Sequence, residues 1–285
     1  DEAFAHPTNV AMFLREAHAQ AHVIVAGLLH DVIEDFSDQE GDRKTMTRKE
    51  RDAGLCLLRA KFAEGLITTS TRLNFPRDVA ERIVEVVWTL TRHKADLYYK
   101  SISGIFTHPD FEVRLAAALV KLADRMHNIE TIENYEEHEQ IYQCFKNLFI
   151  LNNAKRLLNE MRSRTVDARM VVSLEKMFKK NGKATFRALH HIDHIRDAND
   201  PLFPLLTYMA LALRKFNLEI NGLWRVTESK LEPGVPLYNL YDGIVKKYDN
   251  RLHREDAEFA AQMQKEQDYC AVTFQYLNLP PEQIR

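Results

Sequence analysis

The adjacent residues His30 and Asp31 follow an apolar run over residues 23–29, and both have side chains that bind metal ions. A helix that is apolar on nearly every side is expected to be buried, and a buried imidazole or carboxylate is costly unless it is paired or bound to a metal. The same helix is predicted to supply Glu34 and Asp35 one turn farther on, so that four polar groups gather at one helix end. The pattern predicts a functional site here.

A metal site at this point needs ligands from other segments, because two adjacent residues supply only part of the shell of a divalent ion. One candidate is His6, which precedes Pro7 and a helical stretch over residues 8–16. Proline is favourable at a first helical position. The sequence therefore predicts that His6 lies immediately ahead of a helix.

The other candidate is Asp124, which ends an apolar helix predicted over residues 115–123. Asn128 lies one turn farther on the same helix face. Lys121 and Arg125 flank the carboxylate and are cationic groups that an anionic substrate would meet. Mixed imidazole and carboxylate ligands suit manganese, iron or zinc, and the residues alone do not choose among these ions.

Four short patterns in this order resemble the HD-domain phosphohydrolases: His6-Pro7, His30-Asp31, Glu34-Asp35, and the run from Lys121 to Asn128. Within that superfamily, residues 1–150 are most similar to the hydrolase half of the RelA/SpoT homologues and to the small alarmone hydrolases. Those enzymes remove the 3′-pyrophosphate from guanosine tetra- and pentaphosphate. The resemblance therefore implies an HD-type helical bundle and a (p)ppGpp 3′-pyrophosphohydrolase activity.

The resemblance also implies a role for each matched residue. The protein ligands of one divalent ion, which would be manganese with iron or zinc as alternatives, are His6, His30, Asp31 and Asp124. Glu34 and Asp35 match the acidic pair that positions and deprotonates the attacking water, and Asn128 matches a residue that contacts the nucleotide near its ribose. General chemistry agrees, because a divalent ion makes water a better nucleophile and a general base must lie within hydrogen-bond reach of that water.

Several histidines have a structural interpretation beside a functional one. His190 and His194 lie one helical turn apart and would form a second metal site with His191 and Asp193, but an exposed polar helix face is the favoured interpretation. His127 is interpreted either as an acid near the metal or as a hydrogen-bonded structural residue.

The aromatic residues are interpreted mainly as packing residues. Tyr98 and Tyr99 are predicted to pack, with stacking on a base as the alternative, and Trp88 and Trp224 are predicted to lie in the core. Arg92 begins a further cationic group after the helix that contains Trp88, and it receives no assigned role.

Composition places the chain among folded enzymes. It has 285 residues, 45% of them hydrophobic, and a formal net charge of −2, which predicts a sizeable core and no bulk attraction for nucleic acid or membrane. No apolar run approaches the roughly 20 residues of a transmembrane helix. Three scattered cysteines, Cys56, Cys144 and Cys270, predict reduced thiols and a cytoplasmic location.

Helical periodicity predicts an all-α fold. Long 3.6-residue patterns cover residues 77–90, 111–135, 137–162 and 202–220, and only 9 glycines and 9 prolines interrupt the chain. The charged segment 36–49 is predicted to be a loop beside the site. We expect an HD-type phosphohydrolase domain over residues 1–162 and a helical extension of unknown role over 163–285, which is where a protein partner or a second copy would bind.

Three functions follow from these patterns. The first is an alarmone pyrophosphohydrolase. The second is an HD phosphohydrolase of another nucleotide. The third is a regulatory module that binds a nucleotide without turnover and uses the C-terminal region to bind a protein.

Overall fold

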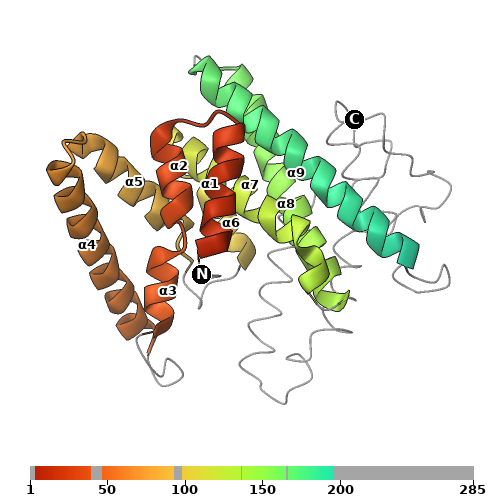
Figure 1. Cartoon of the computed structure of the whole chain (residues 1–285), viewed down its shortest axis with the longest axis horizontal. Helices are drawn as coiled ribbons and strands as arrows, with labels where there is room; N and C mark the ends of the chain where they lie inside the picture. Colours follow the sequence, from red (N-terminus) through yellow and green to blue (C-terminus); the bar gives the residue numbers. More distant parts are fainter. Residues whose placement is uncertain (1–3, 40–46, 93–97, 136, 165, 196–285) are drawn as a thin grey trace. The chain divides into compact units, whose positions relative to one another are not determined.

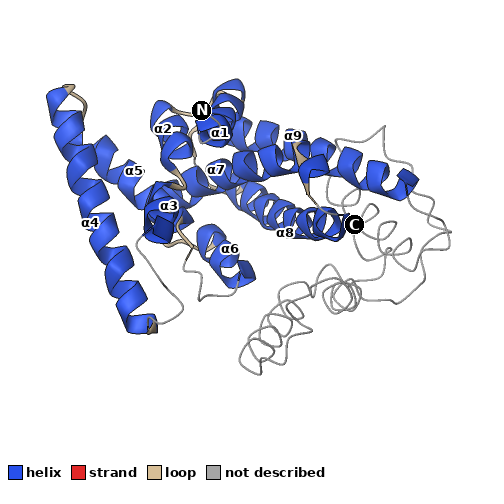
Figure 2. Ribbon diagram, turned by 60° about the horizontal axis from the view of Figure 1, so that its bottom comes forward, coloured by secondary structure: helices blue, strands red, loops and turns tan. Residues whose placement is uncertain are grey.

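The computed structural model describes residues 4–39, 47–92, 98–135, 137–164 and 166–195. Every regular element in these segments is a helix (Figures 1 and 2). The predicted all-α fold is therefore confirmed, while the helix predicted over 202–220 lies outside the described residues. None of the described helices combines the length and the hydrophobicity that crossing a bilayer requires.

Residue contacts divide the chain into two units. The first unit contains Asp1–Asp124 and Leu157–Met177, and the second contains Arg125–Arg156 and the residues from Phe178 onward. Within the first unit, Gln20 donates a hydrogen bond of 3.0 Å to Asp167. The domain boundary predicted at residue 162 stays a prediction.

The first two helices of unit 1 approach each other closely. α2 (Ala21–Leu29) packs against α1 (Ala5–Glu16). A Cβ atom at Gly27 would lie 2.4 Å from Leu14 Cδ1, whereas ordinary carbon contacts are about 3.5–4.0 Å. Leu14 is fully buried, so it has little room to move. The absence of a side chain at position 27 therefore allows this close approach.

The chain breaks its helical path at the predicted site. α2 ends at Leu29, and α3 (Val32–Gln39) begins after His30 and Asp31, so one continuous helix through the acidic pair was a wrong prediction. The carbonyl of Asp31 accepts a 2.8 Å hydrogen bond from the backbone of Asp35 and so begins the new helix, and aspartate is a favoured residue at such a start. The predicted loop over 36–49 is also helical at both ends, because α3 runs to Gln39 and the next helix begins at Arg48.

Two long helices follow. α4 (Arg48–Arg72) begins with a capping box between Thr47 and Glu50, and it packs against α3 and α5 (Figure 1). α5 (Arg77–Leu90) has the predicted bounds and also packs against α2. Its buried face is formed by Ala80, Ile83, Val84, Val86, Val87 and Leu90. This apolar stripe aligns the end of α5 with the His30 region.

The buried centre of unit 1 is the first part of α7 (Phe111–Glu130), which follows the short helix α6 (Tyr98–Phe106). Asp110 starts α7 by accepting backbone hydrogen bonds of 2.9 Å and 3.1 Å from the next turn. Residues 115–120 are all buried. The predicted helix over 111–135 ends instead at Glu130 and is followed by a short 3-10 helix, Ile132–Asn134.

Unit 2 contains most of α8 (Glu137–Arg162), whose bounds match the prediction, and the second part of α9 (Ala168–Ile195). Three buried polar side chains connect these helices. Asn147 Nδ2 donates to Asn181 Oδ1 at 2.6 Å and to Thr185 Oγ1 at 2.5 Å. Because buried polar groups require partners, this network restricts how the two helices can pair.

Candidate metal centre and adjoining pocket

Three segments of unit 1 bring metal-binding side chains to one point. His6 Nε2 lies 3.3 Å from His30 Nε2 and 3.4 Å from Asp124 Oδ1. The ligand atoms of these three residues all lie within 4.8 Å of one another. Donor atoms that share an ion at about 2.0–2.2 Å are themselves roughly 3–4 Å apart, so the spacing is that of ligands around one ion.

Asp31 adds a fourth donor beside this group. Its Oδ2 lies 3.0 Å from His30 Nε2 and 3.6 Å from His6 Nε2, and its side chain is 38% exposed. Two imidazoles and two carboxylates form a donor set that suits a divalent transition metal. The residues present therefore fit the ion that the sequence predicts, and the identity of that ion stays open among manganese, iron and zinc.

His6 lies in the first turn of α1, not ahead of the helix as predicted. α1 begins at Ala5, so Pro7 is the third helical residue. Proline is tolerated throughout a first helical turn, because the backbone N–H groups there have no partner within the helix. His6 therefore projects from a helix that is held against α2.

Hydrogen bonding fixes the orientation of the His30 ring. His30 is 3% exposed, and its Nδ1 lies 2.8 Å from the carbonyl oxygen of Gly27. A carbonyl oxygen only accepts, so Nδ1 carries the proton and Nε2 is left to face the other ligands. Burial lowers the pKa of His30, but the hydrogen bond to Asp31 and the charge of Asp124 outweigh it, so the net pKa is raised.

Asp124 is buried, and its two carboxylate oxygens face different partners. Oδ1 faces His6, and Oδ2 accepts a 2.7 Å hydrogen bond from Lys121 Nζ one turn earlier on α7. A buried carboxylate is costly without such a partner. The predicted cation Lys121 therefore lies at the site and also lines the pocket that opens beside it.

The predicted acidic pair is separated by the structure. Glu34 lines the pocket, and its Oε1 accepts a 2.5 Å hydrogen bond from the backbone N–H of Arg92, just after α5. Burial raises the pKa of Glu34 above the ordinary glutamate value, although the hydrogen bond from Arg92 opposes this. Asp35 is exposed and is not among the residues that line the pocket.

The remaining predicted substrate residues lie later on α7, in unit 2. Arg125 is 5% exposed, and its Nη2 donates to the carbonyl oxygen and the side-chain oxygen of Gln143 at 3.3 Å and 2.7 Å. Its guanidinium is thus buried in a contact with α8. Asn128 and His127 are half-buried. The substrate contacts predicted for Arg125 and Asn128 stay predictions.

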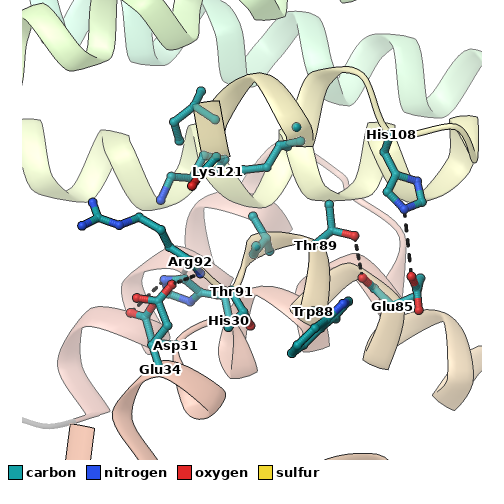
Figure 3. A pocket seen from close by; sticks show the side chains of 15 residues that line it. His30, Asp31, Glu34, Glu85, Trp88, Thr89, Thr91, Arg92, His108 and Lys121 are labelled. Carbon is teal, nitrogen blue, oxygen red and sulfur yellow. Dashed lines mark hydrogen bonds and ion pairs between the residues drawn. The ribbon is translucent and has the colours of Figure 1, made fainter. Parts of the chain in front are cut away.

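A pocket of about 570 Å³ extends from the metal-binding residues along α5 and α6 (Figure 3), and its volume lies within the range of small-molecule sites. Sequence reasoning missed its far end, where Glu85, Trp88 and His108 lie. Trp88 is half-buried and lines the pocket, so its predicted place in the core was wrong. No motif marks these residues, and only folding brings them together.

Other sequence predictions fall on side chains outside the described residues. These side chains are those of Tyr98, Tyr99, His190, Asp193, His194 and Trp224. His191 is exposed, as expected for a polar helix face. The second metal site proposed for this part of α9 is therefore untested.

Residues 3–129 match the family model described as "HD domain". This part of the chain is similar to HD domains. The match includes all four predicted ligands and the acidic pair. The matched region thus covers the segments selected from the sequence, and HD domains bind divalent metals.

Curated relatives match the same part of the chain. A probable guanosine-3′,5′-bis(diphosphate) 3′-pyrophosphohydrolase of Mycoplasma pneumoniae is 32% identical over 130 residues, which are 46% of this chain and 15% of the relative. A GTP pyrophosphokinase of Brucella ovis is 30% identical over 141 residues, 50% of this chain and 15% of the relative. A relative in Synechocystis, with the same name as the Mycoplasma protein, is 28% identical over 147 residues, 51% of this chain and 16% of the relative.

The chain spans 15–16% of the length of these curated relatives. No solved structure matches the chain significantly.

Proposed function

We propose that the HD domain hydrolyses the 3′-pyrophosphate of guanosine tetra- and pentaphosphate with the aid of one divalent ion, most simply manganese. The observation that carries the proposal is the convergence of His6, His30 and Asp124 within 4.8 Å, beside a pocket that contains a half-buried glutamate. The names of the relatives in Mycoplasma pneumoniae and Synechocystis support this substrate.

Each residue has a distinct part in this reaction. His6, His30, Asp31 and Asp124 would hold the ion, which supplies charge neutralisation at the phosphoryl oxygens and lowers the pKa of a water molecule. Glu34 accepts the proton from the attacking water as general base. The water oxygen forms a bond to the 3′-linked phosphorus, the bond from that phosphorus to the 3′ oxygen breaks, and pyrophosphate leaves while the ribose hydroxyl takes a proton from solvent.

The surroundings of Glu34 suit a general base. The Arg92 N–H holds one of its carboxylate oxygens, which fixes the direction of the side chain. Burial raises the pKa of Glu34, and a base whose pKa lies closer to the working pH takes a proton more effectively. Lys121 adds a positive charge where phosphates would accumulate negative charge.

The test measures pyrophosphate and guanosine diphosphate released from guanosine tetraphosphate by the full chain with manganese. Glu34→Gln should keep the bound metal, because every proposed ligand remains, and should lower kcat by about 10²–10⁴. Asp124→Ala should lose metal and activity together. If the wild type forms no more product from guanosine tetraphosphate than Asp124→Ala does, the substrate assignment is rejected.

The other functions predict different outcomes of the same experiment. Release of phosphate or pyrophosphate from another nucleotide in a panel, with none from guanosine tetraphosphate, would favour a different HD phosphohydrolase. Binding of metal and nucleotide without turnover of any panel member would favour a regulatory module. Metal loss in Glu34→Gln as well as in Asp124→Ala would mean that Glu34 is a ligand and not a base.

A further inference from the structure

Unit 2 contains a local excess of positive charge, although the whole chain has a formal net charge of −2. Residues 140–156 of α8 and 178–192 of α9 include seven lysine and arginine residues and no aspartate or glutamate. Charges gathered on one part of a surface create a local potential that the net charge does not reveal. The composition therefore argues against a bulk attraction for polyanions but not against a local one.

The exposed charges of α9 in unit 2 lie in one row. Lys180, Lys183 and Arg187 are all exposed, and they follow one another at spacings of three and four residues. This spacing places them on one face of a helix. The opposite face is buried and consists of Phe178, Asn181, Thr185, Ala188 and Ile192. The row therefore points away from the packed side of α9.

The row belongs to a helix whose position against α8 is fixed (Figure 1). Asn147 on α8 donates hydrogen bonds to Asn181 and Thr185, on the buried side of α9. Lys155 on α8 lies with its Nζ 5.6 Å from the centre of the Phe178 ring. Because the buried network sets how the two helices pair, the backbone beneath the row is ordered before a ligand arrives, and binding costs less conformational freedom.

The length of the row suits a short stretch of nucleic-acid backbone. Lys180 and Arg187 are seven residues apart, which is about 10 Å at a rise of 1.5 Å per residue. One strand of a duplex presents a phosphate about every 3.4 Å along the axis, so about three phosphates lie within this length. A duplex is stiff on this scale and holds its phosphates in line. Three cations can therefore meet three phosphates together.

Two other anionic partners fit this surface less well. A helix that lies on a membrane inserts exposed apolar side chains, and a protein interface has apolar or aromatic anchors at its centre. Among the side chains of unit 2 that the structure describes, no large hydrophobic one is exposed. The surface thus offers charge without an apolar anchor, and contacts with phosphates need only that charge.

We propose that the exposed face of α9 formed by Lys180, Lys183 and Arg187 binds the phosphate backbone of a nucleic-acid duplex. Contacts with phosphates carry no sequence information, so the duplex is bound without selection of its sequence and with an affinity that depends on salt. The proposal goes beyond the hydrolysis proposed above and does not depend on it, because the residues assigned to that reaction lie in unit 1.

The test follows the fluorescence anisotropy of a labelled DNA duplex titrated with the full chain. Duplexes of two unrelated sequences should bind to the wild type with equal affinity. Neutralising about three phosphates gives a slope of about −0.9 per phosphate in a plot of log affinity against log salt concentration. The affinity should therefore fall about 40-fold between about 50 and 200 mM salt.

The decisive variant is Lys180→Gln/Lys183→Gln/Arg187→Gln. It should bind the duplex at least about tenfold more weakly at about 50 mM salt, and most of the salt dependence should disappear. Glutamine is a good helix former and the three positions are exposed, so α9 should remain folded. An unchanged melting curve by circular dichroism checks this.

A matched control removes three exposed charges from α4 instead, in Lys49→Gln/Lys61→Gln/Arg72→Gln. This control changes the net charge by the same amount but leaves the row on α9 intact. Its affinity for the duplex and its salt dependence should remain close to those of the wild type.

Four results would overturn the proposal. Equal losses of affinity in the two triple variants would mean that total charge, and not this face, attracts the duplex. Affinity of the wild type that does not change with salt would mean that phosphates do not carry the binding. Tighter binding to phosphatidylserine vesicles than to the duplex would identify a membrane surface, and displacement of the duplex by an equal charge of polyglutamate would identify a site for acidic proteins.

Discussion

The close contact between α1 and α2 positions two of the proposed ligands, and a single added methyl group tests it. In Gly27→Ala the new Cβ would lie 2.4 Å from Leu14 Cδ1, about 1.1 Å inside the lower limit of ordinary carbon contacts. Val10 Cγ1 lies 3.4 Å away on the same side, and both neighbours are fully buried. The two helices must therefore separate or Leu14 must repack.

The size of the effect follows from two opposing terms. Overpacking of a core costs about 1–3 kcal/mol, and replacing glycine by alanine within a helix returns about 1 kcal/mol. A matched control is Gly65→Ala in α4, where a Cβ meets nothing within 4 Å and only the favourable term applies. The free energy of unfolding of Gly27→Ala should therefore be about 1–3 kcal/mol lower than that of Gly65→Ala.

The assay is urea unfolding of the two variants followed by circular dichroism, together with manganese binding. Because α1 contains His6 and the Gly27 carbonyl orients His30, Gly27→Ala should also weaken manganese binding, whereas Gly65→Ala should not. Equal stabilities, or unchanged manganese affinity in Gly27→Ala, would refute the argument that this contact aligns the two histidines.

Three further predictions address single groups. Burial raises the pKa of Glu34, so ionisation of this carboxyl group opposes folding above that pKa. Glu34→Gln should therefore raise the Tm of the metal-free protein near pH 8. A gain in Tm that persists near pH 4 would contradict this explanation. Arg125→Met removes buried hydrogen bonds to Gln143, so it should lower the free energy of unfolding by about 1.5–3 kcal/mol. Unchanged stability together with a raised KM would instead support the substrate role predicted from sequence. Burial raises the pKa of the Cys144 thiol to about 12, whereas Cys56 is exposed. Peptide mass spectrometry after iodoacetamide treatment should therefore find Cys56 modified long before Cys144. Equal rates of modification would show that Cys144 is accessible.

The helical frame was predictable because its signals are local. The apolar stripe of α5 and the long pattern of α8 gave bounds that the structure reproduces. Local signals were misleading where two rules competed. Pro7 is acceptable at several positions of a first turn, so His6 lies inside α1, and Asp31 can start a helix as readily as it can continue one.

Parts of the site could not be predicted because they depend on tertiary contacts. Arg125 is adjacent to Asp124 in sequence, but it points into a buried contact with Gln143. The adjacent Glu34 and Asp35 point in different directions from α3, so that one lines the pocket and the other is exposed. The far end of the pocket depends on a pairing between α4 and α5, and no spacing within either segment indicates it.

The central claim is that one divalent ion binds between α1, the end of α2 and α7. Its most direct test is a crystal structure of the manganese-loaded protein with anomalous data collected at the manganese edge. The account predicts a single strong peak at about 2.0–2.2 Å from the nearest atoms of His6, His30, Asp31 and Asp124. A peak at another place, or none at these residues in a protein that retains manganese, would contradict it.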